Sequence, residues 1–266
     1  MTRLAVLGAG VMGTAILSAL LDAGAFQPEQ VSASTLDDDC RRRLTDELKV
    51  SVTDNARAVS DAEVVLISVK PDVVSSVLSE IRDQLPEGAL VISVAAGVTL
   101  DTLESELPEG TAVIRVMPNT PVVVREGMLV LSPGKECSAG QIDRAQELLS
   151  WCGSVLTVPE KYQDMVTGVS GSGPAYVFAL VEAMIEGAVV QGLPRAVATE
   201  LTVQTLYGAA SLLRQQGGHP ALLREQVTSP GGTTAAGLRA LDAGGFRVAV
   251  VDAVEAATRR AGELGS

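Results

Sequence analysis

A glycine-rich turn near the N-terminus lies between a short apolar run and a helical pattern. The apolar run covers residues 4–7, glycines follow at positions 8, 10 and 13, and apolar side chains recur at 16, 17, 20 and 21. In this order Gly8 makes a tight turn, Gly10 lets the backbone approach a pyrophosphate, and Gly13 lets the helix pack closely on the strand. The pattern therefore predicts a strand, a turn and a helix that together bind a dinucleotide.

The same residues also permit a competing interpretation, a secretory signal in which Arg3 precedes an apolar stretch. Glycines interrupt that stretch, Asp22 lies near its end, and cleavage would delete a strand that the following units need. A second apolar stretch, residues 175–193, carries Glu182 and Glu186 one helical turn apart, which disfavours a membrane span. We therefore expect a soluble chain that does not cross a membrane.

Composition limits the classes of partner. The formal net charge is −12, and no large basic run opposes it, so nucleic acid and anionic membrane surfaces are disfavoured as ligands. Three cysteines without a C-x-x-C pair indicate a reducing compartment, so we expect a cytoplasmic location and assign the cysteines to packing. With one histidine and no Cys/His cluster, no metal site is expected.

Apolar runs and helical patterns alternate along the first 159 residues. Strands are expected at 31–35, 64–69, 89–94, 112–116, 128–131 and 155–158, helices at 72–85, 100–107 and 139–150, and an exposed helix and turn at 37–54. Such alternation indicates βαβ units and a parallel sheet. The fold class is therefore α/β, with an N-terminal Rossmann doubly wound sheet over residues 1–159.

Helical patterns replace strands from residue 160 to residue 266. They cover 173–192, 195–216 and 234–262, and they are apolar over much of their circumference. About 100 residues cannot bury so much apolar surface alone. We therefore expect an all-helical dimerisation domain at 160–266, although packing on the sheet domain of the same chain is the alternative.

A second glycine-rich turn lies in this helical half. Pro230 fixes one φ angle, Gly231 and Gly232 relax the backbone, and two threonines follow at the start of a helix. The hydroxyls and the free N–H groups of the first helical turn would receive a carboxylate or a phosphate. An ordinary capped helix start is the alternative for this turn.

The cofactor prediction depends on the end of the second strand. NAD-specific sheets place a carboxylate there for the ribose hydroxyls, whereas this chain has Ser34 and Thr35. Hydroxyls can donate to a 2′-phosphate, and three arginines follow at 41–43 behind three aspartates at 37–39. NADPH is therefore favoured, although the arginines could equally form a solvated helix face that balances the aspartates.

Read together, these motifs give the chain a close resemblance to the pyrroline-5-carboxylate reductase family over essentially its whole length. The segments that carry it, beside the N-terminal turn, are Val-Lys-Pro at 69–71, Ala-Ala-Gly-Val at 95–98, Arg-Val-Met-Pro-Asn-Thr-Pro at 115–121, the segment 168–176 and the loop 229–234. The resemblance implies hydride transfer from NAD(P)H to the imine carbon of 1-pyrroline-5-carboxylate, giving L-proline. It also implies a homodimer or an oligomer of dimers, with the substrate pocket at the dimer interface.

The resemblance also assigns site residues by their positions in this sequence. Those implied for the cofactor are Gly8, Gly10, Val11, Met12, Gly13, Ser34, Thr35, Asn55, Val69, Lys70, Pro71, Ala95, Ala96, Gly97, Asn119, Thr120 and Pro121. Those implied for the substrate carboxylate are Ser229, Gly232, Thr233 and Thr234. One departure is the triple aspartate, where the family often has a basic residue, so NADH is a possible donor.

Reduction of a protonated imine demands no strong acid or base, because the iminium is already electrophilic. Thr234 is the catalytic candidate for a hydrogen bond to the ring nitrogen, and Lys70 for a charge near the cofactor, while helix capping and an ordinary surface lysine are their alternatives. His219 lies in a Gly-Gly-His-Pro turn and is expected to cap it.

Two other functions remain open. A β-hydroxyacid dehydrogenase needs a catalytic lysine on the first long helix of its second domain, yet residues 173–192 contain none. A non-catalytic NADP-binding regulator would not need the complete polar loop that begins at Ser229.

Overall fold

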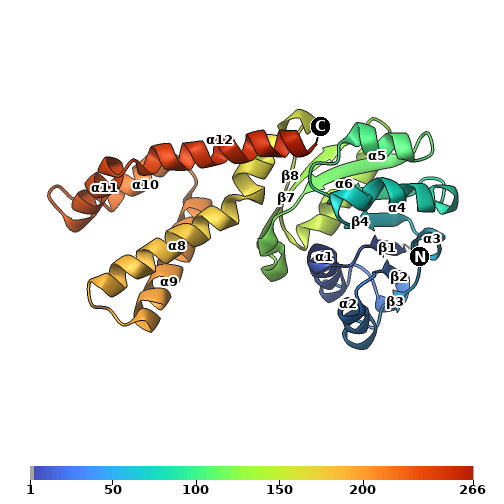
Figure 1. Ribbon diagram of the computed structural model, residues 1–266, viewed down its shortest axis with the longest axis horizontal. Coiled ribbons are helices and arrows are strands. Elements are labelled where there is room, and N and C mark those ends of the chain that lie inside the picture. The colour runs from blue at the N-terminus through green and yellow to red at the C-terminus, as the bar shows by residue number, and fades with distance from the viewer. Residues whose placement is uncertain (1–2, 266) are drawn as a thin grey trace. The chain divides into compact units, whose positions relative to one another are not determined.

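The computed structural model describes residues 3–265. It divides into two compact units (Figure 1), which are described separately. The sheet unit runs to Ser172 and takes in the chain again from Ala256, and the helical unit covers Gly173–Glu255. The contacts group residues 160–172 with the sheet, whereas the sequence predicted a domain boundary after residue 159. That boundary stays a prediction.

Eight strands form one sheet in the order β3-β2-β1-β4-β5-β6-β7-β8. Every neighbouring pair is parallel except β6 and β7. The order reverses at β1, next to β4, as in doubly wound nucleotide-binding sheets. The predicted fold class is therefore confirmed. The strands are β1 (Leu4–Leu7), β2 (Val31–Ser34), β3 (Ser51–Val52), β4 (Val64–Ile67), β5 (Leu90–Ser93), β6 (Ala112–Met117), β7 (Gly127–Pro133) and β8 (Gly153–Thr157).

Two features of the sheet differ from the prediction. The segment 37–54, expected as a helix and turn, also contains the two-residue strand β3, which is too short to leave a sequence pattern. Strand β7 runs antiparallel to β6 because only residues 118–126 connect them, and these hold the short 3₁₀ turn η5 (Thr120–Val124). A parallel connection needs a crossover of a dozen residues or more.

Helices cover both faces of the sheet, and each face has its own core. On one face Leu4 and Val6 of β1 pack with α1 and α6, and on the other Ala5 and Leu7 pack with α3, α4 and α5. Both sets of side chains alternate along one buried strand, as expected for a parallel sheet covered on both faces. The helices are α1 (Val11–Asp22), α2 (Asp38–Arg42), α3 (Asn55–Val59), α4 (Val74–Ile81), α5 (Leu100–Glu106), α6 (Ala139–Ser150) and α7 (Gln163–Val166).

Short 3₁₀ and π turns extend several of these helices. They are η1 (Pro28–Gln30), η2 (Arg43–Glu47), η3 (Pro71–Val73), η4 (Arg82–Gln84), η6 (Glu160–Tyr162) and η7 (Thr167–Gly171). The helix expected at 72–85 is thus η3, α4 and η4 in succession, and residues 160–171 are helical without having been expected so.

One of the three cysteines lies in the hydrophobic core, directly before β8 in the chain. Cys152 is fully buried, and this burial raises the pKa of its thiol to about 11. The thiolate form is therefore scarce at neutral pH, which suits the packing role assigned to this cysteine.

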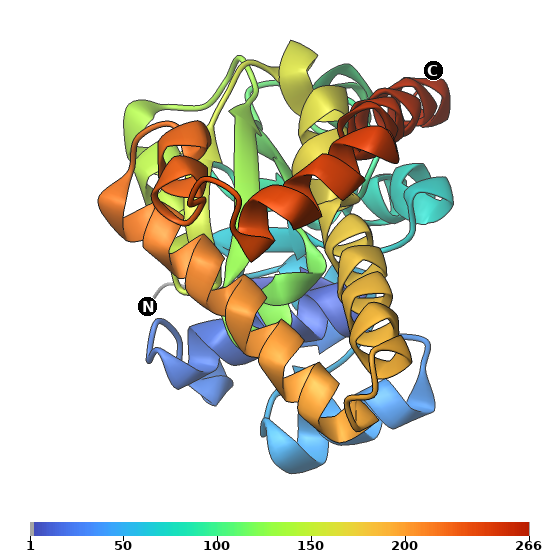
Figure 2. The ribbon, with the colours of Figure 1, turned by 90° about the vertical axis from the view of Figure 1, so that its left-hand side faces the viewer.

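The helical unit contains α8 (Gly173–Val190), α9 (Arg195–Gln216), α10 (Pro220–Gln226), α11 (Thr233–Ala243) and the start of α12 (Phe246–Leu264). Figures 1 and 2 show that α8 and α9 form a helical hairpin, in which a short turn connects the two helices. The prediction of one helix at 234–262 is wrong, because the chain there forms two helices, α11 and α12. They are separated at Gly244 and Gly245, and Gly245 has a φ of 73°. Helix α10 was not expected, because its seven residues show little periodicity.

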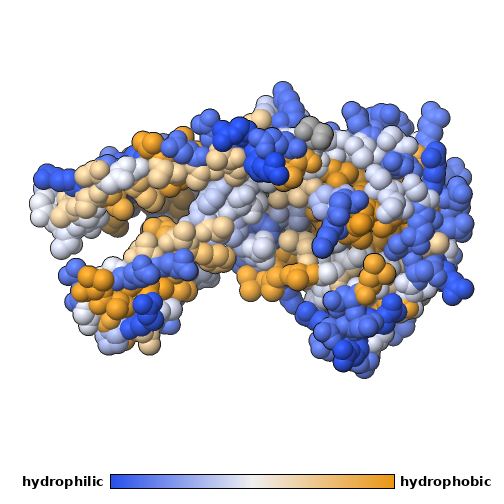
Figure 3. Space-filling view, viewed as in Figure 1, coloured by the Kyte–Doolittle hydropathy of each residue, from blue (hydrophilic) through white to orange (hydrophobic). Residues whose placement is uncertain are grey.

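This helical unit has almost no interior of its own. Of its described residues only Ile185, Ala198 and Thr202 are buried. Large apolar side chains stand exposed, including Phe178 at 62% and Tyr207 at 66% of their full area. Figure 3 shows the resulting apolar surface along these helices. Exposed apolar surface of this extent is typical of a protein–protein interface and not of the surface of a soluble monomer.

Within residues 3–265, one helical run is long and apolar enough, by length and composition, to cross a membrane. It covers residues 160–190, and none of its most apolar window is buried within the chain. The expectation that no segment crosses a membrane therefore stays a prediction.

Candidate active site

Several helices begin with a capping side chain and several others begin without one, among them α4, α7 and α9. The two helices that begin at a residue of a glycine-rich turn belong to the second kind. Helices α2, α3, α5 and α6 each begin with a side chain that accepts a backbone N–H, and these caps are Asp37, Asp54, Thr99 and Ser138. In contrast, α1 and α11 begin at Gly10 and Gly232, and within the described chain neither start has a side-chain cap. The first-turn N–H groups of these two helices are therefore left for another acceptor, and anions are preferred there.

The turn between β1 and α1 is fixed by backbone hydrogen bonds. The N–H groups of Gly8 and Ala9 both donate to the carbonyl oxygen of Ser34, at 3.1 and 3.0 Å, which ties the turn to the end of β2. Gly8 has a φ of +81°, and a Cβ added there would lie 2.4 Å from Cγ1 of Val69. Around a Cβ added at Gly10, by contrast, no described atom lies within 4 Å. The turn is thus closed at Gly8 and open at Gly10, as a pyrophosphate requires.

A cavity of about 600 Å³ adjoins this turn. It brings together five of the residues predicted for the cofactor, namely Gly8, Ser34, Thr35, Asn55 and Val69. The sequence prediction missed its other lining residues, which include Arg41 of α2 and Thr53, Ser76 and Glu80. Its place beside the ends of β1 and β2 is that of the adenosine half of a dinucleotide in doubly wound sheets, so we refer to it as the adenosine cavity.

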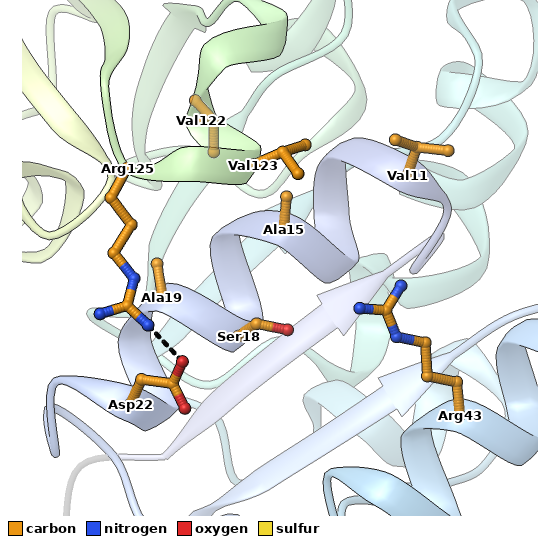
Figure 4. A pocket seen from close by; sticks show the side chains of 9 residues that line it. All are labelled: Val11, Ala15, Ser18, Ala19, Asp22, Arg43, Val122, Val123 and Arg125. Carbon is orange, nitrogen blue, oxygen red and sulfur yellow. Dashed lines mark hydrogen bonds and ion pairs between the residues drawn. The ribbon is translucent and has the colours of Figure 1, made fainter.

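Other predicted cofactor residues lie outside this cavity. Lys70 is exposed and is the residue before η3, with Pro71 as its first turn residue. Met12 is half-buried in the first turn of α1. Val11 is 83% exposed and lines a separate hollow of about 190 Å³ between α1 and η5. Figure 4 shows this hollow, in which Arg125 forms an ion pair with Asp22.

Two loops follow the carboxyl ends of β5 and β6. Ala95 is buried, Ala96 is exposed, and Gly97 has a φ of +79°, a conformation that favours glycine. In the second loop the amide of Asn119 is held at both ends, since Nδ2 donates to the Ser170 carbonyl at 3.0 Å and Oδ1 accepts from the Met128 N–H at 2.8 Å. Asn119 therefore positions its loop, where Thr120 is exposed and Pro121 is half-buried.

An ion pair between the buried Arg115 and the half-buried Glu160 holds the loop after β5. Oε1 of Glu160 accepts from Arg115 Nη1 at 2.9 Å and from the Leu100 N–H, at the start of α5, at 2.7 Å. The side chains of Arg115 and Glu160 are only 8% and 30% exposed. One carboxylate thus joins β6, η6 and the end of the loop that contains Ala95, Ala96 and Gly97.

The substitution Glu160→Ala is expected to lower the free energy of unfolding by about 3 kcal/mol, because it leaves Arg115 buried without its partner. Urea or thermal unfolding measures this change. The control is Glu147→Ala, which breaks the exposed pair with Arg144 and should cost below about 1 kcal/mol. Equal effects of the two substitutions would contradict the role given to the buried pair.

The second glycine-rich turn lies in the helical unit and precedes α11. Gly231 has a φ of +69°, and the N–H of Gly232 donates to the Ser229 carbonyl at 3.0 Å. Gly232 itself has an ordinary φ of −75° and is the N-cap residue, directly before the first residue of α11. Thr233 and Thr234 form the first turn of α11, with Thr234 half-buried. Both threonines thus belong to the first turn of a helix whose start has no side-chain cap.

The doubly wound sheet, with its open glycine turn and adenosine cavity, defines a dinucleotide-binding protein of the Rossmann class. Two family models match the chain: "NADP oxidoreductase coenzyme F420-dependent" over residues 3–97, and "Pyrroline-5-carboxylate reductase dimerisation" over residues 160–264. A pyrroline-5-carboxylate reductase of Methanosarcina acetivorans is 42% identical over 99% of this chain and 98% of its own length. The chain belongs to the pyrroline-5-carboxylate reductase family.

Further relatives agree with this assignment. Pyrroline-5-carboxylate reductase 3 of Xenopus laevis is 44% identical over 97% of this chain and 94% of its own length. A solved pyrroline-5-carboxylate reductase of Coxiella burnetii, 34% identical, superposes with a TM-score of 0.93 over 100% of this chain and 99% of that one. The Plasmodium falciparum enzyme, solved with NADP bound, is 28% identical with a TM-score of 0.90, over 100% and 98% of the two chains.

Proposed function

We propose that this protein reduces the carbon–nitrogen double bond of 1-pyrroline-5-carboxylate to give L-proline, with NADPH as its preferred hydride donor and NADH as a possible one. Its family membership over the whole chain is the main support. The Plasmodium relative was solved with NADP, so the same cofactor is proposed here.

The uncapped start of α11 is the structural observation that carries the substrate assignment. The substrate is a small ring with a carboxylate, and the N–H groups after Gly232 and the two threonine hydroxyls offer that carboxylate donors at the positive end of a helix dipole. Ser229 adds a third hydroxyl, because its Oγ lies 2.3 Å from where a Cβ of Gly232 would stand. We assign Ser229, Gly232, Thr233 and Thr234 to substrate binding.

The sheet unit fits a nicotinamide dinucleotide at the open face of Gly10 and in the adenosine cavity. Bound there, NADPH would supply the hydride that the imine carbon receives. The chain then has to hold the substrate carboxylate, orient the ring and deliver at most one proton. Thr234 is our candidate for a hydrogen bond to the ring nitrogen, and Lys70 for a positive charge near the cofactor. Positioning of this kind can supply several kcal/mol of the barrier reduction.

We also propose that two copies of the chain form a homodimer that covers the apolar faces of α8 and α9, and that dimers can assemble further. The single-chain exposure of Phe178 and Tyr207 supports this, as does the match to the dimerisation family model. Such burial would also explain the apolar run 160–190 without a membrane. The proposed location is the cytoplasm, on the grounds of the unpaired cysteines.

Purified protein should oxidise NADPH only when 1-pyrroline-5-carboxylate is added, with proline formed in equal amount. Absorbance at 340 nm and amino-acid analysis measure the two changes. A folded protein that binds NADPH but does not turn over this substrate would refute the proposal. Turnover of a 3-hydroxy acid instead would favour the β-hydroxyacid dehydrogenase alternative, although α8 contains no lysine for that chemistry.

A further inference from the structure

The adenosine cavity contains a chain of hydrogen bonds that fixes the role of Ser34. Nδ2 of Asn55 donates to Oε2 of Glu80 at 2.8 Å, and a carboxylate only accepts. The amide oxygen of Asn55 must therefore face Ser34, whose hydroxyl donates to it at 2.5 Å. The one proton of Ser34 is thus in use, and toward a ligand this hydroxyl can only accept.

Thr35 is arranged in the opposite way. Its Oγ1 accepts from the Asp37 N–H at 3.2 Å, so its own proton stays available for a ligand. A 2′-phosphate has acceptor oxygens only, and a ribose 2′-hydroxyl can donate. Of the two hydroxyls at the end of β2, Thr35 therefore suits a phosphate and Ser34 suits a sugar hydroxyl.

The three consecutive arginines have three different surroundings. Arg42 is paired with Asp39, and Arg43 lies 3.5 Å from Glu47 and lines the hollow of Figure 4 instead of the adenosine cavity. Arg41 lines the adenosine cavity, and within residues 3–265 no carboxylate lies within ion-pair distance of its guanidinium. Only Arg41 is placed to meet a ligand there.

The guanidinium of Arg41 is also held in position. Its Nη2 donates to the Thr35 carbonyl at 3.1 Å, which uses one of five N–H donors and directs the group to the end of β2. Two of the three aspartates before it are engaged elsewhere, since Asp37 accepts from the Cys40 N–H and Asp39 pairs with Arg42. None of these aspartates lines the cavity.

Resting on the proposed use of NADPH, we infer that Arg41 and the Thr35 hydroxyl form the receptor for the 2′-phosphate, and that Ser34 does not donate to it. Arg41 reaches the end of β2 from helix α2, past Leu36 and the three aspartates that follow Thr35 in the sequence. Specificity for NADPH then depends on one arginine whose neighbours in sequence are bound elsewhere.

The test compares Arg41→Gln with Arg42→Gln as a matched control on the same helix. Binding of adenosine 2′,5′-bisphosphate and of 5′-AMP is measured by calorimetry, and kcat/KM by assay with NADPH and with NADH. Arg41→Gln should weaken the bisphosphate and lower kcat/KM for NADPH by about 10- to 100-fold, the loss of one or two hydrogen bonds to a charged group. The values for 5′-AMP and NADH should change less than about 3-fold, and so should every value for Arg42→Gln.

Two further variants separate the two hydroxyls. Ser34→Ala should change the ratio of NADPH to NADH by less than about 3-fold, and Thr35→Val should lower it by about 5- to 10-fold, the cost of one hydrogen bond to a charged acceptor. An equal loss with both cofactors in Arg41→Gln, or a larger loss of ratio in Ser34→Ala than in Arg41→Gln, would overturn the inference. If no variant or wild-type protein reduces the imine, the bisphosphate measurements still decide it, because they need no turnover.

Discussion

The substitutions Gly8→Ala and Gly10→Ala are expected to fail in different ways, although the two glycines belong to one turn. Gly8→Ala should lower the free energy of unfolding by about 3 kcal/mol, from a left-handed φ of +81° and from overlap with Val69. The overlap includes the Cα and N atoms of Val69 at 2.9 Å, so a side-chain rotation does not relieve it.

Gly10→Ala should leave the fold nearly intact. The φ of Gly10 is −73°, which alanine adopts freely, and no described atom would lie within 4 Å of the added methyl group. The methyl group would occupy the space in front of the uncapped N–H groups of α1. Loss of two hydrogen bonds to a charged pyrophosphate would weaken NADPH binding on the order of 100-fold.

Thermal unfolding and fluorescence titration with NADPH distinguish the two outcomes. Gly24→Ala serves as control, because Gly24 has a φ of +70° and no described atom within 4 Å of an added Cβ, so it reports the cost of the left-handed backbone alone. A Gly10→Ala protein with wild-type NADPH affinity would show that this turn does not hold the pyrophosphate.

The first turn was predictable because its sequence pattern is local, although the Ser34 carbonyl and Val69, which also hold it, come from later in the chain. A buried strand, three glycines and an apolar helix follow one another within about 20 residues, and each acts on its neighbours. Helix α6 was predicted with its correct bounds for a similar reason, since Ser138 and Gln141 form a capping box at its start. Helix α9 is likewise delimited, by Pro194 before it and Gly217 after it.

The adenosine cavity was only half predictable, because its lining comes from separate elements. Glycines and hydroxyls at the ends of β1 and β2 follow sequence rules, whereas Glu80 lies on α4 and meets Asn55 only after the sheet has formed. Which of the three adjacent arginines lines the cavity also depends on how helix α2 is turned about its own axis, and the sequence alone does not determine this. Asn119 is a similar case, since its partners Ser170 and Met128 are far apart in the chain.

The substitution Thr234→Val tests whether the glycine-rich turn before α11 acts in the same reaction as the turn between β1 and α1. Valine keeps the shape of threonine and removes its hydroxyl, so the start of α11 should survive while the proposed donor to the substrate is lost. If Thr234 bonds to the ring nitrogen, kcat/KM for 1-pyrroline-5-carboxylate should fall on the order of 100-fold, the usual effect of one such donor. The Kd for NADPH should stay unchanged, because the residues proposed to bind it all belong to the sheet unit.

Two control variants are needed to interpret the activity of Thr234→Val. Thr234→Ser keeps the hydroxyl and should retain most of the activity, whereas Thr199→Val removes an exposed hydroxyl of α9 that donates to the Arg195 carbonyl and should have no effect on turnover. If Thr234→Val reduces the imine as fast as the wild type, the hydroxyl has only a structural role at the helix start. If Thr234→Val loses activity and Thr234→Ser keeps it, the reaction depends on the hydroxyl itself, because neither a fold defect nor weaker NADPH binding predicts that pattern.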